Sequence, residues 1–465
     1  MDSPVILWFR DDLRLSDHAA LDAALAAGRP VLPVYVLDDS GPWPLGGAAR
    51  WWLHHSLTAL AADLAALGSG LVLRRGLAAD IVPALAEETG AGTVYTGGLA
   101  DPAARATDRA VAARLETRGA RLHRMRTTTL YPPDRMKTQA GTPYSRYTPF
   151  LRACLDAPPP PPSEAPARLP PCPRVPSDTL HAWNLLPDRP DWAGGLRATW
   201  IQGDAKPGEA GAKARLDRFV TEAADAYPVE RDRVDHDGSS RLSPHLRFGE
   251  VSPVQVWHAM GEGRRKFLQE LLWREFSHYL LWHNPGLPDT PTNPAYPAMP
   301  WRDDPRGLRA WQRGETGVPI VDAAMRQLWE TGWMHNRARM IAGSFLVKHL
   351  LIDWREGERW FWDTLVDADL ANNAENWQWI AGSGPDAAPF FRVFNPVLQG
   401  QKVDPEGAYV RRYAPEYGGL DARSIHAPWQ VPGWSGRRPI VDLAEGRERA
   451  LAAFRRARGD TSGPR

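Results

Sequence analysis

Three runs of sequence between residues 332 and 379 carry the most specific pattern in the chain: GWMHNRARM (332–340), LIDWREGERWFW (351–362) and DADLANNAENWQW (367–379). They fall on successive elements of a region that is helical in character, and Thr331–Leu351 is predicted to form one long helix. The second half of the chain is therefore expected to be all-helical.

The helical pattern extends outward from these runs to about residue 206 on one side and to the segment Val441–Arg456 on the other. Lys266–Trp282 is a second long helical run. Ser243-Pro244 and Ser252-Pro253 each look like an N-cap followed by a proline in the first turn of a helix. No internal repeat of useful period interrupts the pattern.

The first 130 residues follow a different rule, because short β-rich runs alternate with helical segments. This alternation is typical of a parallel sheet covered by helices, a Rossmann-like arrangement. No G-x-G-x-x-G or P-loop follows the first run, which disfavours a standard nucleotide site there. The predicted strands are Val5–Phe9, Val31–Leu37, Leu71–Arg74 and Thr93–Thr96, and the helical segments include Arg50–Leu67 and Arg105–Arg118.

A proline-rich stretch, APPPPPPSEAPARLPPCPRV (157–176), separates the two patterns. Its composition predicts an extended, stiff connector, and a docking peptide for another protein is the weaker alternative because the stretch lies between two folded halves. The expected organisation is an α/β domain over residues 1–130, a connector over 131–205 and a helical domain over 206–465.

Charge and cysteine content exclude several classes of protein. The net charge is +1, so binding to nucleic acid would need a local basic groove rather than bulk charge. Arginine dominates the cations, which suits phosphate binding but equally a GC-rich genome. The two cysteines, Cys154 and Cys172, argue against a disulfide framework or a four-cysteine metal site and favour a cytoplasmic protein. No signal segment or run of about 18 apolar residues predicts export or a membrane span.

The segment GSSRLSPHLRFGEVSP (238–253) offers hydroxyls, an arginine and a helix start within a few positions. Such a combination can hold a pyrophosphate. For Ser252, ordinary helix capping is the preferred interpretation.

Taken together, the three runs, this segment, ELLWREF (270–276) and the opening FRDDLRLSDH (9–18) resemble the photolyase/cryptochrome family, densely over roughly residues 225–404. The resemblance implies an FAD-binding helical domain and an α/β domain for a second, light-harvesting pigment. It places Tyr227, Ser239, Ser240, Arg241, Leu242, Ser243, Arg274, Trp333, Arg339, Asp367, Ala368, Asp369 and Asn373 at flavin-contacting positions.

Two groups of residues to which the resemblance gives a role also have a purely structural explanation. Asp367 and Arg339 match a buried pair beside the flavin, although an interhelix salt bridge alone would explain them. Trp377, Trp354 and Trp301 match the family's electron-transfer chain, although each alone is explained by core packing. Asn373 matches the position that faces the flavin N5.

The resemblance further implies that damaged DNA is the substrate, with a pyrimidine dimer flipped out of the duplex into a cavity. Glu270 and Trp273 are three apart on one helix, and a Glu270–Arg274 surface pair is the alternative to a role in binding. Asn336 and Met340 stand where enzymes for the six-four photoproduct have histidines, which favours cyclobutane pyrimidine dimers. His335 should lie on another face, and Arg337 could pair with a phosphate. The implied DNA-binding residues are Arg231, Glu270, Trp273, Asn336, Arg337, Met340, Trp379 and Gln399.

The expected activity is thus light-dependent repair of cyclobutane dimers in UV-damaged DNA, by a monomer with no metal and no obligate protein partner. For the second pigment, methenyltetrahydrofolate is favoured over a deazaflavin, although GGLADPAARATD (97–108) lacks the Asn-Glu pair of many folate binders. The rival is a cryptochrome-type photoreceptor that signals through a protein partner. The short end GDTSGPR (459–465) offers no signalling tail.

Overall fold

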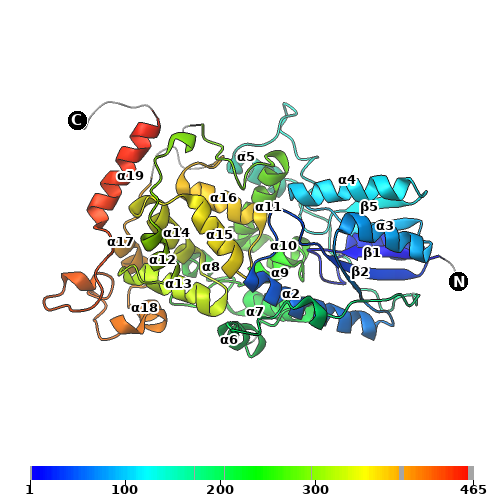
Figure 1. Cartoon of the computed structure of the whole chain (residues 1–465), viewed down its shortest axis with the longest axis horizontal. Coiled ribbons are helices and arrows are strands. Elements are labelled where there is room, and N and C mark those ends of the chain that lie inside the picture. The colour runs from blue at the N-terminus through cyan, green and yellow to red at the C-terminus, as the bar shows by residue number, and fades with distance from the viewer. Residues whose placement is uncertain (1–2, 172, 204, 295, 387–391, 459–465) are drawn as a thin grey trace. The chain divides into compact units, whose positions relative to one another are not determined.

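The computed structural model describes residues 3–171, 173–203, 205–294, 296–386 and 392–458. Cys172 and the terminal segment 459–465, on which sequence expectations were placed, lie outside these ranges. Figure 1 labels the helices and strands along the chain. The chain divides into two compact units. The first unit comprises Met1–Asp225, Ser240–Pro285 and Val366–Ala371, and the second comprises Ala226–Ser239, Gly286–Leu365 and Asn372–Arg465.

The first unit contains a five-stranded parallel sheet in the order β3-β2-β1-β4-β5. This order is that of a Rossmann-type fold, in which helical crossovers connect the strands. The central strands are apolar and buried along their whole length, as parallel sheets covered on both faces require. The strands are β1 Val5–Phe9, β2 Val31–Leu37, β3 Val72–Arg75, β4 Thr93–Gly97 and β5 Arg121–Met125, and the crossover helices are α1 Ala19–Ala26, α2 Gly47–Ala66, α3 Ala78–Thr89 and α4 Pro102–Glu116.

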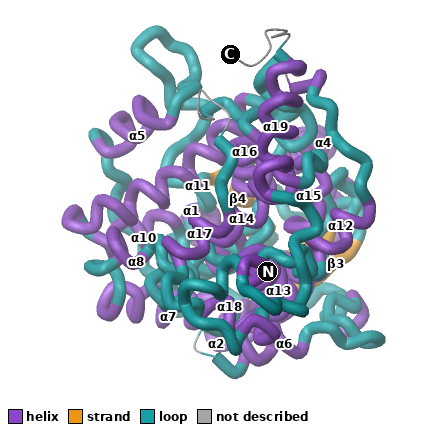
Figure 2. Tube along the Cα trace, turned by 90° about the vertical axis from the view of Figure 1, so that its left-hand side faces the viewer, coloured by secondary structure: helices purple, strands orange, loops and turns teal. Residues whose placement is uncertain are grey.

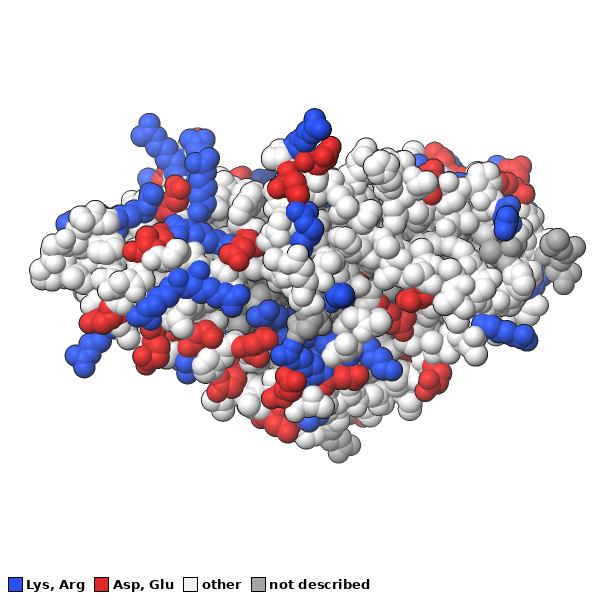
Figure 3. Space-filling model, turned by 90° about the horizontal axis from the view of Figure 1, so that it is seen from below, with Lys and Arg blue, Asp and Glu red and all other residues white. Residues whose placement is uncertain are grey.

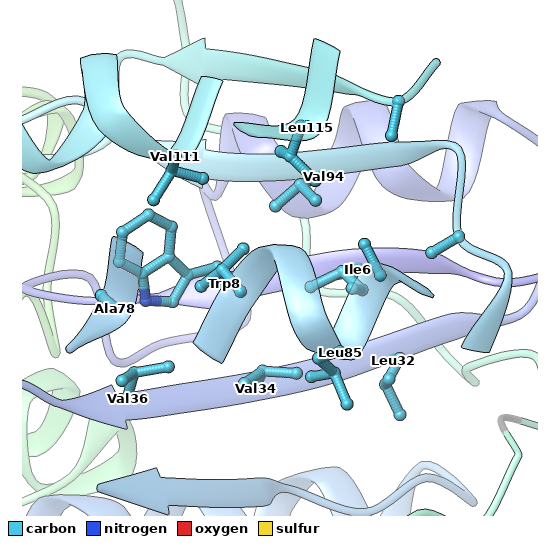
Figure 4. Close-up of a cluster of buried hydrophobic side chains, with 14 of the residues drawn as sticks. Ile6, Trp8, Leu32, Val34, Val36, Ala78, Leu85, Val94, Val111 and Leu115 are labelled. Carbon is cyan, nitrogen blue, oxygen red and sulfur yellow. The ribbon is translucent and has the colours of Figure 1, made fainter. Parts of the chain in front are cut away.

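One face of the sheet forms a hydrophobic core with α3 and α4 (Figure 4). Ile6 and Trp8 of β1 and Val34 of β2 meet Leu85 of α3 and Val111 of α4 there. Alternate residues of each strand point to one side of a sheet, which explains the spacing of two between Ile6 and Trp8. The predicted α/β first part is confirmed.

The fifth strand was not predicted. Its sequence, RLHRM, is mostly exposed and carries two arginines, so it lacks the apolar run by which a strand can be predicted. Strands at the edge of a sheet commonly carry charges in this way. The proline-rich stretch contains no helix or strand over its described residues, and backbone hydrogen bonds join Leu169 N to Leu67 O (3.0 Å) and Asp178 N to Leu73 O (2.9 Å).

The described chain is helical from about residue 206 onward, as predicted, and Figure 2 colours the helices purple. Helix α5 (Tyr147–Leu155) and the short α6 (Gly194–Leu196) were not predicted, because residues 131–205 were expected to form a connector. The first unit adds α5 Tyr147–Leu155, α7 Glu209–Glu222, α9 Ser243–Arg247, α10 Pro253–Met260 and α11 Arg265–His283. The second unit contains α8 Tyr227–Glu230, α12 Pro305–Gln312, α13 Pro319–Thr331, α14 Asn336–Ser344, α15 Trp354–Thr364, α17 Pro396–Val403, α18 Ala408–Tyr413 and α19 Leu443–Ala457, and α16 Leu370–Ala381 begins in the first unit and continues in the second.

The prediction of one helix over Thr331–Leu351 is wrong. Helix α13 ends at Thr331, because Gly332 adopts a left-handed conformation (φ +64°) that terminates it. Helix α14 starts afresh at Asn336 and is capped by His335, whose Nδ1 accepts a hydrogen bond from Arg337 N at 3.1 Å. His335 is therefore a buried capping residue.

The two Ser-Pro pairs behave differently. Ser252 caps α10 as predicted, because its Oγ accepts from Gln255 N (2.9 Å) while Gln255 Oε1 accepts from Ser252 N (2.8 Å). Ser243 is not the N-cap of α9, because Leu242 precedes it with helical backbone angles and occupies that position.

Candidate functional site

The opening motif FRDDLRLSDH packs against the loop that follows α9. Leu13 N donates to Phe248 O at 2.9 Å. Gly249 adopts φ +63°, and a Cβ there would lie 2.1 Å from the carbonyl oxygen of Asp11. Only glycine permits this approach. Two motifs more than 200 residues apart in the sequence thus form one assembly within the first unit.

This assembly places two arginines and a histidine around Asp369. His278 Nε2 lies 3.4 Å from Asp369 Oδ2, and Arg247 and Arg274 both interact electrostatically with the same carboxylate. Arg247 also donates through Nε to Ala368 O (2.6 Å) and pairs with Asp11 (2.7 Å). Burial lowers the pKa of His278 to about 4, against the opposing pull of Asp369, so this imidazole is neutral at physiological pH.

Helix α11 carries the predicted carboxylate and indole. Glu270 pairs with Lys266 (3.0 Å), and Arg274 donates to Thr128 O (2.9 Å) and Leu246 O (3.2 Å). The ring of Trp273 stacks on Tyr147, with ring centroids 3.5 Å apart and planes at 12°. One face of the indole is therefore covered, so a base can stack only on the other face.

A buried arginine, Arg215, holds the backbone of the segment 239–243. Arg215 Nε donates to Ser240 O at 2.7 Å, and Ser240 Oγ accepts from Leu242 N at 3.3 Å. Arg241 adopts φ +50°, a conformation rarely taken by residues other than glycine and asparagine. Hydroxyls and a fixed turn are thereby presented together, as a pyrophosphate requires.

In the second unit, the start of α14 brings together three predicted DNA-binding residues. Asn336 Nδ2 and Arg337 Nη1 lie 3.8 and 3.7 Å from Met340 Sδ. Arg337 is not free for a phosphate in this structure, because its Nε and Nη2 both lie 2.7 Å from Asp232 Oδ1. Arg231 Nε lies 3.5 Å from the same oxygen, and its guanidinium lies over the ring of Tyr227.

Two of the three predicted redox tryptophans are buried. Trp377 and Trp354 have exposed fractions of 4% and 1%, and Trp301 is half-buried. Trp377 packs edge-on against Phe361 (5.0 Å) and Trp311 (6.2 Å), so a fourth indole lies beside the expected chain.

Asn373 is fixed by the backbone of α15. Its Nδ2 donates to Glu358 O at 3.0 Å, and because a carbonyl can only accept, this contact fixes which branch of the amide carries the nitrogen and which carries Oδ1. The carboxylate of Glu358 is fully buried, and neither of its oxygens has a hydrogen-bond partner among the described residues. Burial raises the pKa of Glu358 well above its ordinary value, because the charged form loses its hydration there.

The predicted site residues are distributed over both units. Asp367 belongs to the first and Arg339 to the second, so their ion pair stays a prediction. Arg339 donates through Nε to Met334 O at 2.8 Å, Trp333 is buried beside His335, and Trp379 and Gln399 are half-buried. The first unit holds Ser240, Arg241, Leu242, Ser243, Glu270, Trp273, Arg274, Asp367, Ala368 and Asp369; the second holds Tyr227, Arg231, Ser239, Trp301, Trp333, Asn336, Arg337, Arg339, Met340, Trp354, Asn373, Trp377, Trp379 and Gln399.

Sequence reasoning missed several residues that the structure joins to this set. Arg247 and Glu358 lie within the motifs quoted in the sequence analysis. A charged residue at a helix position expected to be buried is the feature by which they could have been found. Tyr147, His278 and Asp232 carried no local signal, because only the fold brings them to Trp273, Asp369 and Arg337. The additional residues are Tyr147, Asp232, Arg247, His278, Trp311 and Glu358.

The donor set suits an anionic dinucleotide more than a metal. Within the described residues, no cluster of three histidine, cysteine or acidic side chains has the geometry to hold a metal ion. Buried arginines beside Asp369 and the hydroxyls of 239–243 are groups that bind phosphates and a flavin ring edge. No helix among the described residues is long and apolar enough to cross a membrane.

Comparison with known proteins agrees with this chemistry. Residues 5–167 match the family model described as DNA photolyase, and residues 267–456 match that of the FAD binding domain of DNA photolyase. A deoxyribodipyrimidine photo-lyase of Agrobacterium fabrum is 48% identical over 97% of this chain and 98% of its own length. Cryptochrome-2 of Arabidopsis thaliana is more distant, at 34% identity over 98% of this chain and 80% of its own.

A solved structure gives the same result for the fold. The crystal structure of a bacterial class III photolyase from Agrobacterium tumefaciens superposes with a TM-score of 0.93 at 48% identity, covering 99% of this chain and 98% of that one. Both family models together span most of the chain, in the order in which its two patterns occur. This chain therefore belongs to the DNA photolyase family.

Proposed function

We propose that this protein repairs cyclobutane pyrimidine dimers in UV-damaged DNA, using blue light and a bound FAD. The observation that carries the proposal is helix α11, which presents Glu270 and Trp273 one turn apart in a chain of the DNA photolyase family. A carboxylate that accepts a base N–H and an indole that stacks on the base are the groups a flipped dimer needs.

FAD would be held by the hydroxyls and backbone of residues 239–243 at its pyrophosphate, and by the cations around Asp369 together with Asn373 near the flavin ring. When bound in its reduced form, FAD supplies and recovers the electron that splits the cyclobutane ring. The chain's own residues bind, orient and shield it. Asn373 Oδ1 accepts a hydrogen bond without adding a negative charge, which suits a reduced, anionic flavin.

The remaining parts of the proposal concern the other half of the chain and its surroundings. Residues 1–130 form the domain for a light-harvesting pigment, with methenyltetrahydrofolate favoured over a deazaflavin, residues 131–205 connect it and residues 206–465 form the flavin domain. The protein acts as a monomer in the cytoplasm, with damaged DNA as its partner.

The test uses purified protein with its flavin reduced chemically, mixed with dimer-bearing duplex DNA and either illuminated with blue light or kept dark. We expect loss of dimers in the light only, and FAD rather than FMN in the supernatant after heat release. A photoreceptor would bind FAD but leave dimers intact in both samples. Release of FMN, or of no flavin, would contradict the proposal that the protein binds FAD, on which the proposed repair depends.

A further inference from the structure

The two arginines predicted to bind DNA, Arg231 and Arg337, share one carboxylate. Asp232 Oδ1 lies 2.7 Å from Arg337 Nε, 2.7 Å from Arg337 Nη2 and 3.5 Å from Arg231 Nε. All three residues belong to the second unit, with Arg231 and Asp232 directly after α8 and Arg337 in the first turn of α14.

The carboxylate occupies the groups that a phosphate would use. A guanidinium binds phosphate or carboxylate through neighbouring N–H groups on one edge, and Asp232 already takes the Nε and Nη2 edge of Arg337. The side chains of Asp232 and Arg337 are 35% and 30% exposed, so a DNA backbone can reach the pair. Burial opposes ionisation of Asp232, but the hydrogen bonds and charges of Arg337 and Arg231 outweigh it and lower its pKa, so the carboxylate is ionised at neutral pH.

The overall charge of the protein makes this competition at Asp232 significant. The whole chain carries 56 basic and 55 acidic residues, and on the face drawn in Figure 3 basic and acidic side chains lie interspersed. Bulk attraction to DNA is therefore weak, and individual arginines decide how strongly the backbone is held. A change at one carboxylate should be measurable.

We propose that Asp232 is a specificity-determining residue that competes with DNA phosphates for Arg231 and Arg337. This inference rests on the proposed function. Undamaged DNA offers only its backbone, so the phosphate contacts it gains are largely offset by the loss of the Asp232 contacts. A dimer adds contacts with the flipped bases. Asp232 thereby keeps undamaged DNA from retaining the enzyme, an example of a built-in repulsive element.

The experiment measures the affinity of the FAD-loaded protein for undamaged and dimer-bearing duplexes over a range of salt concentrations. Asp232→Asn keeps the shape and an acceptor but removes the charge. We expect it to bind undamaged duplex about three- to tenfold more tightly at low salt, with a log–log salt slope steeper by up to about 0.9, the increment for one added phosphate contact. Repair of dimers in excess undamaged DNA should slow.

Three further variants isolate the cause. Asp303→Asn removes the same charge from an exposed aspartate of the second unit and should change the affinity much less. Asp232→Glu keeps the charge and should retain the wild-type slope. In an Arg337→Ala background, most of the gain from Asp232→Asn should disappear, since its main competitor is gone.

Three outcomes would overturn the inference: weaker DNA binding by Asp232→Asn, which would make Asp232 a positioning residue; an unchanged salt slope; or a full gain in the Arg337→Ala background. These outcomes are separate from failure of the proposed function, which would appear as a wild-type protein that does not distinguish dimer-bearing from undamaged DNA. Thermal unfolding of each variant confirms that it is folded.

Discussion

At the scale of single residues, the amide of Asn373 has one orientation, because its Nδ2 donates to Glu358 O. A carbonyl oxygen cannot donate, so the group facing Glu358 O is the amide nitrogen, and Oδ1 is the other branch of the amide. The neighbouring Glu358 carboxyl is buried, and burial raises its pKa well above the ordinary value. The flavin ring proposed to lie at Asn373 would meet the neutral amide of that residue.

Replacing Asn373 with aspartate should disturb both stability and redox chemistry. The variant loses the hydrogen bond to Glu358 O and sets two acceptors against each other, which costs about 1–3 kcal/mol of unfolding free energy. Its negative charge should also make bound FAD harder to reduce fully, a lower midpoint potential in a redox titration. Asn376→Asp, on the exposed face of the same helix, is the control. Equal potentials for Asn373→Asp and wild type would contradict this role.

Trp377 tests whether the buried indoles carry electrons. With Trp377→Phe we expect light-driven reduction of oxidised flavin to be lost, while chemically reduced protein still repairs dimers. Packing alone predicts the reverse pattern, a loss of about 1–2 kcal/mol in stability with photoreduction intact. Flavin absorbance under blue light distinguishes the two. Undiminished photoreduction in a folded variant would point to Trp311, which packs against Trp377, as another route.

Glu375 should make stability depend on pH. Its side chain is 3% exposed, and burial, with a contribution from Asp386, raises its pKa to about 7. The folded-state pKa exceeds the unfolded value of about 4.3, so the folded protein binds this proton more tightly and loses stability as the pH rises from about 4 through 7.

Glu375→Gln should remove this dependence and, at about pH 8, stabilise the protein by at most on the order of 4 kcal/mol. Urea unfolding of the FAD-loaded protein at a series of pH values measures it, with the exposed Glu406→Gln as control. A variant whose stability follows pH as wild type does would show that Glu375 does not titrate in this range.

At the scale of helices and strands, Gly357 of helix α15 lies against the ring of Trp377 on α16. A Cβ on Gly357 would lie 2.1 Å from the ring of Trp377, whereas a Cβ on Gly343 of α14 would lie 3.5 Å from the same ring. The first position has no room for a methyl group and the second has ordinary contact distance.

Gly357→Ala should therefore displace Trp377, destabilise the protein by about 2–3 kcal/mol and slow photoreduction. Gly343→Ala, the matched control, should be neutral or slightly stabilising, because alanine favours helix by up to about 1 kcal/mol. Thermal unfolding and photoreduction of both variants test this. Similar effects of the two substitutions would mean that the close crossing at Gly357 does not position Trp377.

The same scale shows what the sequence could predict. Buried strands such as Val5–Phe9 and Val31–Leu37 were predictable because their apolar runs are unbroken, and Ser252 because its cap is local. The polar edge strand β5 had no such signal. The break between α13 and α14 was missed because Gly332 within an apolar pattern looks tolerable until its left-handed conformation is known.

For the site, motifs located residues but not their partners. The spacing of Glu270 and Trp273 on one helix was predictable, yet Tyr147, which stacks on Trp273, comes from more than 120 residues away. Likewise Arg337 was predicted to meet a phosphate, and its pairing with Asp232 emerged only from the fold. Such long-range contacts depend on packing that one sequence does not encode locally.

At the scale of the whole molecule, the near-neutral net charge means that overall attraction to DNA is weak. Recognition must then depend mainly on contacts with the lesion. Asn336 and Met340 lie on one face of α14 and contact each other. An amide and a thioether cannot supply the proton that repair of a six-four photoproduct requires, whereas electron-driven splitting of a cyclobutane ring needs none. The protein should therefore repair one of the two main UV lesions.

The most direct measurement of light-driven dimer repair uses two duplexes of identical sequence, one with a single cyclobutane dimer and the other with a six-four photoproduct at the same site. Each is mixed with the FAD-reduced protein, illuminated with blue light, and analysed by chromatography beside a dark sample. We predict restoration of the cyclobutane duplex in the light alone and none of the six-four duplex. Failure to restore the cyclobutane dimer in a protein that holds reduced FAD would contradict the account.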